Sequence, residues 1–265
     1  MVLQSGEDDG LATAWVADVV RRIRAETPLA VTLSLGERPE ADLAAWREAG
    51  ADRYLLRFET ANRALYDRIH PPRPGRRSDR LAILRTLRDL GYQIGSGVMV
   101  GIPGQTVDDL ADDLETFRAL DLDMIGLGPY LAHPATPLGR RPPGGADADQ
   151  APNTQAMTCK MLALARLLCP RANIPSTTAL ATLNPEGGRK SGLRRGANVV
   201  MPNLTPTRRR ALYAIYPGKV CAREDPVTYH ARLMEMLRRL GRTAGAGRGD
   251  SPRYAGAQAA GPVGG

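Results

Sequence analysis

Short apolar runs alternate with helix-length amphipathic segments along this chain, and no other feature restricts its possible folds as strongly. Each run ends in a polar or glycine-rich cluster: residues 2–8, VTLSLGE ending at Glu37, RYLLRFET ending at Thr60, GVMVGIPGQT ending at Thr106, MIGLGPY ending at Tyr130, NIPSTTA ending at Ala179 and ANVVMPN ending at Asn203. Strands that alternate with helices form parallel sheets, whose functional residues gather at the carboxyl ends of the strands. The length of 265 residues suits one such barrel, which typically needs about 250. The pattern therefore predicts an α/β fold, a (β/α)8 TIM-type barrel of which about seven βα units are present.

Apolar residues at helical spacing predict helices over residues 11–25, 41–49, 81–90, 107–120, 155–168 and 208–215. Gly50 and Gly91 follow two of these segments and favour helix ends there. The predicted barrel domain covers residues 1–242. Residues 243–265 are largely Ala, Gly and Pro, which predicts a disordered tail. This tail contains GRGDSP at residues 247–252, an integrin-type adhesion sequence that we interpret as a chance match.

The composition disfavours several classes of protein. The net charge of +8 comes mainly from scattered arginines, and aromatic residues are only 5% of the chain, so nucleic acid is not expected as a partner. No apolar stretch reaches the roughly 18 residues of a membrane span, and no signal-peptide pattern is present. We therefore expect a cytoplasmic protein without membrane contact. Cys159, Cys169 and Cys221 form no close cluster, which disfavours a disulfide framework and a zinc site.

Arg57 and Glu59 lie two residues apart in the run RYLLRFET. Side chains at this spacing in a strand share one face, which we expect to look into the barrel mouth. A buried ion needs a partner, because leaving it unpaired costs several kcal/mol. The two side chains therefore either form an interior salt bridge or bind a zwitterionic ligand, and both interpretations are open at this point.

The GIPGQT turn, residues 101–106, leaves a predicted strand and opens a predicted helix. Thr106 is the expected N-cap, and Asp109 completes a capping box. Because the amino end of this helix would point at the mouth, its free backbone N–H groups suit a carboxylate or a ribose hydroxyl.

Polar side chains also follow the first strand and the last two. The first cluster sets two carboxylates, Glu7 and Asp8, beside a glycine, although Ser5 or Asp8 alternatively caps the following helix. Thr177 and Thr178 follow Ser176 at the end of the sixth predicted strand. Tyr213 and Tyr216 share one face of a later helix, where packing and catalysis are both possible roles.

Eight segments between Val2 and Cys221 carry a further signal when they are taken in order. They are LQSGED, VTLSLGE, ADRYLLRFETAN, GYQIGSGVMVGIPGQTVDDL, DMIGLGPYLAHPATPLG, NIPSTTA, RGANVVMPNLTP and LYAIYPGK. Together they resemble the HydE family of radical S-adenosylmethionine maturases of FeFe hydrogenase. Biotin synthase and 3-methylornithine synthase are relatives with the same barrel, but VTLSLGE, RFETAN and VGIPGQT favour the hydrogenase maturases.

The resemblance implies S-adenosylmethionine and a 4Fe-4S cluster as cofactors, the cluster being held by a CxxxCxxC loop after the family's first strand. This loop is absent from the sequence, so the resemblance implies that the first βα unit and the cluster loop are missing. Without the three thiolates the chain as given is expected not to start a radical reaction. The resemblance further implies assembly of the two-iron subcluster of the hydrogenase from a small iron-containing substrate, and contact with other hydrogenase maturases.

The resemblance also implies roles for individual residues. Ser5, Gly6 and Glu7 match the stretch that holds the methionine amino group, and only Cys221 matches the pattern of a second cluster, which we do not expect here. The residues expected to bind the cofactor are Gln4, Ser5, Gly6, Glu7, Thr32, Arg57, Glu59 and Arg80. The expected substrate cavity contains Thr177, Thr178 and Met201, and the expected catalytic residues are Arg57, Glu59, Tyr213 and Tyr216.

Three hypotheses follow for the protein as a whole. In the first, the chain is a truncated form of an active maturase. In the second, it is a non-catalytic barrel remnant that binds a ligand or a partner. In the third, it keeps the radical chemistry and acts on a substrate of the biotin or 3-methylornithine type.

Overall fold

The computed structural model describes residues 1–71, 75, 77–140, 149–210, 212, 215, 217–218 and 226–254. Its centre is a five-stranded parallel sheet in which the strands follow one another in chain order. The strands are β1 (Val2–Gln4), β2 (Thr32–Ser34), β3 (Arg53–Leu55), β4 (Gln93–Val100) and β5 (Met124–Pro129). Parallel neighbours in sequential order, each joined through a helix, form the curved wall of a barrel. The α/β barrel prediction is therefore confirmed.

Two of the seven predicted strands are present only as isolated bridges. Asn173 pairs with Met124, Ser176 with Leu127, and Val199 with Pro175, all in parallel, so the wall continues past β5. The prediction of full strands at these two runs is wrong. Proline has no N–H to donate to a ladder, and Pro175 lies in the middle of the sixth run.

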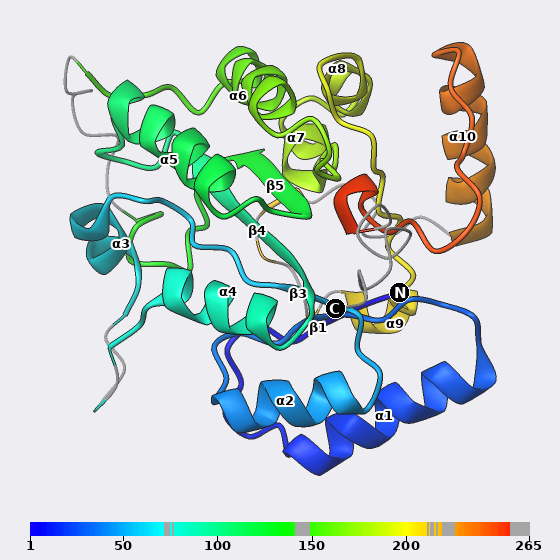
Figure 1. The fold of residues 1–265 in the computed structure, drawn as a ribbon. Helices are drawn as coiled ribbons and strands as arrows, with labels where there is room; N and C mark the ends of the chain where they lie inside the picture. Colours follow the sequence, from blue (N-terminus) through cyan, green and yellow to red (C-terminus); the bar gives the residue numbers. More distant parts are fainter. Residues whose placement is uncertain are drawn as a thin grey trace, which may run out of the picture.

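Helices surround the sheet in an arc (Figure 1). Helices α4 and α5 pack on β4, α6 packs on β5, and α1 packs on α2. The bounds are α1 (Thr13–Glu26), α2 (Glu40–Glu48), α3 (Arg63–Ile69), α4 (Arg80–Asp89), α5 (Val107–Ala119), α6 (Gln155–Leu168), α7 (Thr178–Leu183), α8 (Gly188–Arg194), α9 (Thr207–Arg210) and α10 (Pro226–Arg239). Five of the six predicted helices agree with these bounds within about two residues, the usual uncertainty of a helix end. Of the sixth, residues 208–215, α9 ends at Arg210, Leu212 is also helical, Ile215 is not, and residues 211, 213 and 214 lie outside the described part.

The predicted helix signals are present in the structure. Thr106 and Asp109 form the capping box of α5. Gly50 and Gly91 adopt φ values of +106° and +84° after α2 and α4, in the left-handed region that glycine enters most readily. Between sheet and helices lies one apolar core, whose largest buried side chains include Leu33, Tyr54, Ile94, Trp46, Leu84 and Phe117.

Part of the C-terminal segment beyond the predicted boundary at residue 242 binds to the barrel. Ser251 is fully buried, its amide donates to Gln93 Oε1 (3.0 Å), and its hydroxyl donates to Asp123 Oδ1 (2.6 Å). Asp250 accepts from Arg53 Nη2 (2.6 Å) and from Gln93 Nε2 (2.7 Å). The expectation of disorder is therefore wrong for residues 248–253, because polar groups at the starts of β3, β4 and β5 bind them. Residues 255–265 lie outside the described part of the chain.

Two further observations concern membrane-spanning helices and metal sites. Within the described ranges, no helix is both long enough and apolar enough to cross a membrane. Across the same ranges, no group of three or more His, Cys, Asp or Glu side chains is arranged to hold a metal ion. Cys159 is buried and Cys169 half-buried, both as free thiols, as expected for packing residues, and Cys221 lies outside the described residues.

Candidate functional site

Arg80 joins the carboxyl ends of the first three strands. It is the first residue of α4, and its Nε donates to Glu37 Oε1 (2.8 Å) after β2. Its Nη2 donates to Glu7 Oε1 (2.8 Å) after β1, and its Nη1 donates to the carbonyl of Arg57 (2.7 Å) after β3. A guanidinium can serve several acceptors at once because its five N–H groups lie in a rigid fork. The predicted residues Glu7, Arg57 and Arg80 are thus brought together.

Glu37 is the most buried member of this cluster, with 2% of its surface exposed. Its Oε1 also accepts from the hydroxyls of Ser78 (2.5 Å) and Tyr66 (3.3 Å). Burial acts to raise the pKa of Glu37, but hydrogen bonds from Arg80 and Ser78 outweigh burial and hold the pKa below its usual value. The same contact raises the pKa of Arg80 despite burial, which acts to lower it. The contact between Arg80 and Glu37 therefore favours the charged form of both side chains.

Sequence reasoning missed Glu37 as a site residue, together with Ser78 and Tyr66. Glu37 had a usable signal, since it ends the run VTLSLGE at the carboxyl side of a predicted strand. Ser78 and Tyr66 had none, because they belong to a loop and to α3 and reach Glu37 only through the fold.

Arg57 and Glu59 form an ion pair with Nη2 and Oε2 3.3 Å apart. Arg57 Nη2 also donates to the carbonyl of Val98 (2.6 Å). Arg57 Nε and Glu59 Oε2 are buried, and neither has a hydrogen-bond partner within the described residues. The interior salt bridge is therefore present, and it leaves one donor and one acceptor for a ligand, so the two interpretations of the sequence are compatible.

The first strand end lies next to this cluster. Glu7 Oε2 accepts from the amide of Glu37 (2.9 Å), and a Cβ on Gly36 would collide with the Glu7 carboxylate. Ser5 donates its amide to the carbonyl of Ser34 (3.2 Å) in continuation of the sheet. Gly6 has a φ of +77° and open space beside it. Gln4 is exposed as the last residue of β1.

Neither Ser5 nor Asp8 caps the following helix. The N-cap of α1 is Ala12, which makes no side-chain cap hydrogen bond. Asp8 Oδ1 instead accepts from the amide of Gly10 (2.9 Å) within the loop. The capping alternative for the first cluster is therefore wrong.

The GIPGQT turn reaches the mouth, but its amides are already bonded. Gln105 Oε1 accepts from the amides of Gly101 (2.7 Å) and Ile102 (3.2 Å). The amide of Gly104 donates to Gln150 Oε1 (2.6 Å), and that of Thr106 to Asp109 Oδ2 (2.7 Å). The expectation of free N–H groups is wrong for these positions, because side chains of the same fold bind them. The carbonyls of Ile102 and Pro103 also accept hydrogen bonds, from Gln150 Nε2 (3.1 Å) and Arg68 Nη2 (2.9 Å), so the turn offers a ligand mainly its shape.

Thr177 and Thr178 begin α7 beside the carboxyl end of β5. Thr177 is the N-cap, and its Oγ1 accepts from the amide of Leu180 (3.4 Å). A Cβ on Gly128 would meet Thr177 Oγ1 at 3.0 Å, so β5 and this cap are in close contact. Tyr213 and Tyr216 lie outside the described residues.

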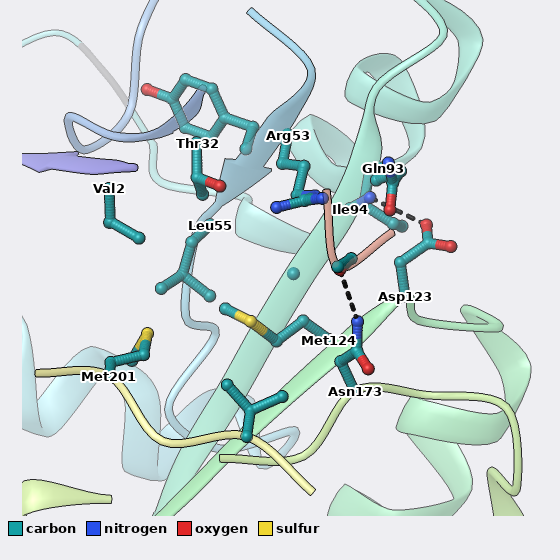
Figure 2. A pocket seen from close by; sticks show the side chains of 14 residues that line it. Val2, Thr32, Arg53, Leu55, Gln93, Ile94, Asp123, Met124, Asn173 and Met201 are labelled. Carbon is teal, nitrogen blue, oxygen red and sulfur yellow. Dashed lines mark hydrogen bonds between the residues drawn. The ribbon is translucent and has the colours of Figure 1, made fainter. Parts of the chain in front are cut away.

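A separate cavity of about 140 Å³ lies inside the barrel wall, toward the amino ends of the strands. Leu55, Met124 and Met201 face one another across it (Figure 2). Thr32, the first residue of β2, also lines the cavity and is buried. The predicted residues Thr32 and Met201 are thus brought together here, at the opposite end of the strands from Glu37. Gly249 of the C-terminal segment borders the cavity and accepts a hydrogen bond from Asn173 Nδ2 (3.2 Å).

Comparisons with known proteins agree with this architecture. The family model of the radical SAM superfamily matches residues 2–117. The chain is similar to 3-methylornithine synthase of Methanosarcina acetivorans, with 27% identity over 69% of this chain and 48% of the relative. A crystal structure of methylornithine synthase superposes with a TM-score of 0.69 and 22% identity, covering 93% of this chain and 66% of that one, which shows a shared barrel fold.

A stronger likeness points to one branch of this superfamily. FeFe hydrogenase maturase subunit HydE of Thermotoga maritima is 47% identical over 245 residues, which are 92% of this chain and 67% of the relative. The chain therefore belongs to the HydE family of the radical S-adenosylmethionine superfamily.

Proposed function

We propose that this protein binds S-adenosylmethionine at the carboxyl ends of β1 to β4 and takes part in maturing the two-iron subcluster of FeFe hydrogenase. One observation carries the binding proposal: within the described residues the buried Arg57 Nε has no hydrogen-bond partner, and the buried Glu59 Oε2 has none beyond its ion pair with Arg57 Nη2. Buried polar atoms without partners are rare in native proteins, because each costs about 1–3 kcal/mol. A ligand with both a donor and an acceptor would remove that cost.

S-adenosylmethionine has the matching chemistry. Its α-amino group and ribose hydroxyls donate hydrogen bonds, and its carboxylate accepts them. We assign the Glu59 carboxylate to a donor of this ligand and the Arg57 guanidinium to an acceptor. Ser5, Gly6 and Glu7 would hold the amino group, since Gly6 leaves open space at the end of β1. Arg80 already binds Glu7 and Glu37, so its proposed role is to orient Glu7 toward the ligand.

The described residues do not fit a 4Fe-4S cluster. Such a cluster needs cysteine thiolates placed around it. Cys159 and Cys169 lie on and just after α6, away from the strand ends of the candidate site, and CxxxCxxC does not occur in the sequence. We therefore derive no reaction step through the cluster. Where a family member holds such a cluster, the cluster would supply the electron for cleavage of S-adenosylmethionine.

The interior cavity is proposed as the substrate end of the site. Thr32 and Met201 line it with Leu55 and Met124. We assign Thr177 and Thr178, at the carboxyl end of β5, to the substrate side of the mouth itself, and keep Tyr213 and Tyr216 as proposed catalytic residues. The substrate would be a small iron-containing molecule. We further propose a cytoplasmic location, with other hydrogenase maturases as partners and neither nucleic acid nor membrane.

Calorimetry with S-adenosylmethionine and with S-adenosylhomocysteine tests the binding proposal on the chain as it is. Arg57→Ala and Glu59→Gln are each expected to weaken binding at least tenfold, because each leaves one buried charge unmatched. Asp67→Asn, in an exposed ion pair on α3, is the control and should leave affinity within twofold. Equal affinity in all three variants would assign the Arg57–Glu59 pair to structure alone.

Genomic sequence separates the first two hypotheses for the whole protein. An in-frame CxxxCxxC upstream of Met1 would support an active maturase. A stop codon in that interval would support a ligand-binding remnant instead.

A further inference from the structure

Asp113 is a fully buried carboxylate on the inward face of α5. Its Oδ1 accepts from the amide of Ala61 (2.5 Å), in the loop after β3. Its Oδ2 accepts from Gln105 Nε2 (3.3 Å), in the turn after β4. The Thr60 hydroxyl is a further hydrogen-bond partner. A single carboxylate thus touches the loops that follow two neighbouring strands.

Gln105 extends this contact to the GIPGQT turn. It is as fully buried as Asp113, and its Oε1 accepts from the amides of Gly101 (2.7 Å) and Ile102 (3.2 Å). The amide group is oriented by both partners, because its N–H must face the Asp113 carboxylate and its oxygen must face the two backbone donors. The buried chain of hydrogen bonds therefore runs from Ala61 through Asp113 and Gln105 to Ile102.

Glu59 lies two residues before Ala61, the residue at which this series of hydrogen bonds begins. Its φ of +64° is unusual for a residue other than glycine. Such a conformation costs about 1–3 kcal/mol and persists only where its surroundings over-determine it. On one side, the Glu59 amide donates to the carbonyl of Gly97 (3.0 Å), and the Met99 amide donates to the carbonyl of Glu59 (3.3 Å). On the other side, the backbone is held at Ala61, whose amide donates to Asp113.

We propose that Asp113 is a positioning residue that holds the loop carrying Glu59 in register with the Gly101–Gln105 turn, so that the two loops present one surface to the adenosyl ligand. The ligand part of this inference rests on the proposed function, whereas the coupling of the two loops does not. The pKa of Asp113 is raised to about 7, first by burial and further by the Asp109 charge, against the Ala61 amide, which lowers it. The role rests on the three donors that converge on this buried side chain, the Ala61 amide, Gln105 Nε2 and the Thr60 hydroxyl, which an apolar side chain of the same size would leave unmatched.

Replacement of Asp113 by Asn isolates the link to Gln105. The Asn oxygen still accepts from the Ala61 amide, but its NH2 group then faces the NH2 group of Gln105, and two donors do not bond. Combining Asp113→Asn with Gln105→Glu restores complementarity, because the new carboxylate accepts from the Asn amide and from Gly101 and Ile102. Asp112→Asn, one residue away on the exposed face of α5, is the matched control.

Amide hydrogen exchange and binding of S-adenosylhomocysteine are the two readouts. In Asp113→Asn, protection of Gly101 and Ile102 should fall at least tenfold and ligand affinity by a similar factor. The combined variant should recover both to within threefold, and Asp112→Asn should change neither by more than twofold. Recovery by polarity reversal is the result that general destabilisation would not produce.

The possible outcomes separate the claims. Unchanged protection in Asp113→Asn, or equal losses in the single and combined variants, would overturn the positioning role. The expected exchange pattern in a protein that binds no S-adenosylhomocysteine would leave the coupling standing and defeat the proposed function. If Asp113→Asn does not fold, Gln105→Met, which keeps the chain length and removes the hydrogen bonds, tests the same link. Full ligand affinity in that variant would overturn the proposal.

Discussion

Arg80 Nε lies 2.8 Å from Glu37 Oε1, and this pair joins α4 to the end of β2 with only 11% and 2% of the two side chains exposed. Ion pairs on a protein surface contribute little, but removing one partner of a buried pair leaves an uncompensated charge. The pair is therefore expected to matter for stability as well as for the shape of the mouth.

Arg80→Met should destabilise the protein by about 3–5 kcal/mol, because it strands the Glu37 carboxylate. Combining it with Glu37→Gln should recover part of the loss, since no charge then remains buried. Urea unfolding at pH 7 measures both. Arg21→Met, from an exposed pair on α1, is the control and should cost less than about 1 kcal/mol. A loss for Arg80→Met no larger than that of the control would contradict the argument.

The same pair predicts a response to acid. The pKa of Glu37 is lower in the folded protein than its usual 4.5, so the folded state binds this proton less readily than the unfolded chain. Its contribution to stability is complete above pH 4.5 and declines as the pH falls through the folded value. Unfolding curves between pH 7 and pH 3 should show this decline, and Glu37→Gln should reduce it.

Asp113 should make the free energy of unfolding depend on pH in the opposite direction from Glu37. Burial raises its folded pKa from 3.8 to about 7, so between these values the folded protein holds a proton that the unfolded chain releases. Its contribution to the free energy of unfolding therefore falls as the pH rises from about 4 to 7, by up to roughly 4 kcal/mol. Asp113→Asn should flatten this part of the pH profile, whereas Asp112→Asn, which removes only a minor contribution to the raised pKa, should leave most of the slope. Parallel profiles for the wild type and Asp113→Asn would show that Asp113 does not titrate in this range.

Ser251→Ala tests the docked C-terminal segment. The substitution leaves Asp123, which is 3% exposed, without the hydroxyl at 2.6 Å. We expect a loss of about 1–3 kcal/mol, together with faster amide exchange at Ser251 and Ile94. Thr243→Ala, at an exposed position before the segment, should change neither quantity. If Ser251→Ala matches this control in both quantities, the Ser251–Asp123 hydrogen bond contributes nothing to the stability of the fold.

The adhesion-like sequence within this segment should not bind an adhesion receptor in the folded protein. The Asp250 carboxylate, which a receptor would need, is occupied by Arg53 and Gln93. Cells that adhere to a free GRGDSP peptide should not adhere to surfaces coated with the folded chain. Adhesion equal to that of the peptide would show that residues 247–252 leave their docked position.

Reconstitution with iron, sulfide and reductant tests the absence of a fitting cluster site. The chain as given should show no cluster absorbance stoichiometric with protein and should form no 5′-deoxyadenosine, because its three cysteines are scattered in sequence. Reproducible binding of one cluster per chain would overturn this expectation.

The sequence by itself determined the repeating βα order, five of the six predicted helices, the capping box of α5 and the family. These features depend on local periodicity, on glycine and capping chemistry, and on segments that can be matched one by one. It also predicted Glu7, Arg57, Glu59 and Arg80 as site residues, and the fold places them near one another because parallel strands end at the same edge of the sheet.

Only the tertiary structure decided which groups are already bonded. The amides of the GIPGQT turn bind Gln105, Gln150 and Asp109 rather than remaining free. Glu37 and Asp113 gained their importance through partners that lie 43 residues away at Arg80 and 52 residues away at Ala61. The segment at 248–253 reads as low complexity, yet it is ordered by polar partners at the starts of three strands. Such contacts join residues that are far apart in the sequence, and the composition around each residue does not show which distant residue the fold will bring beside it.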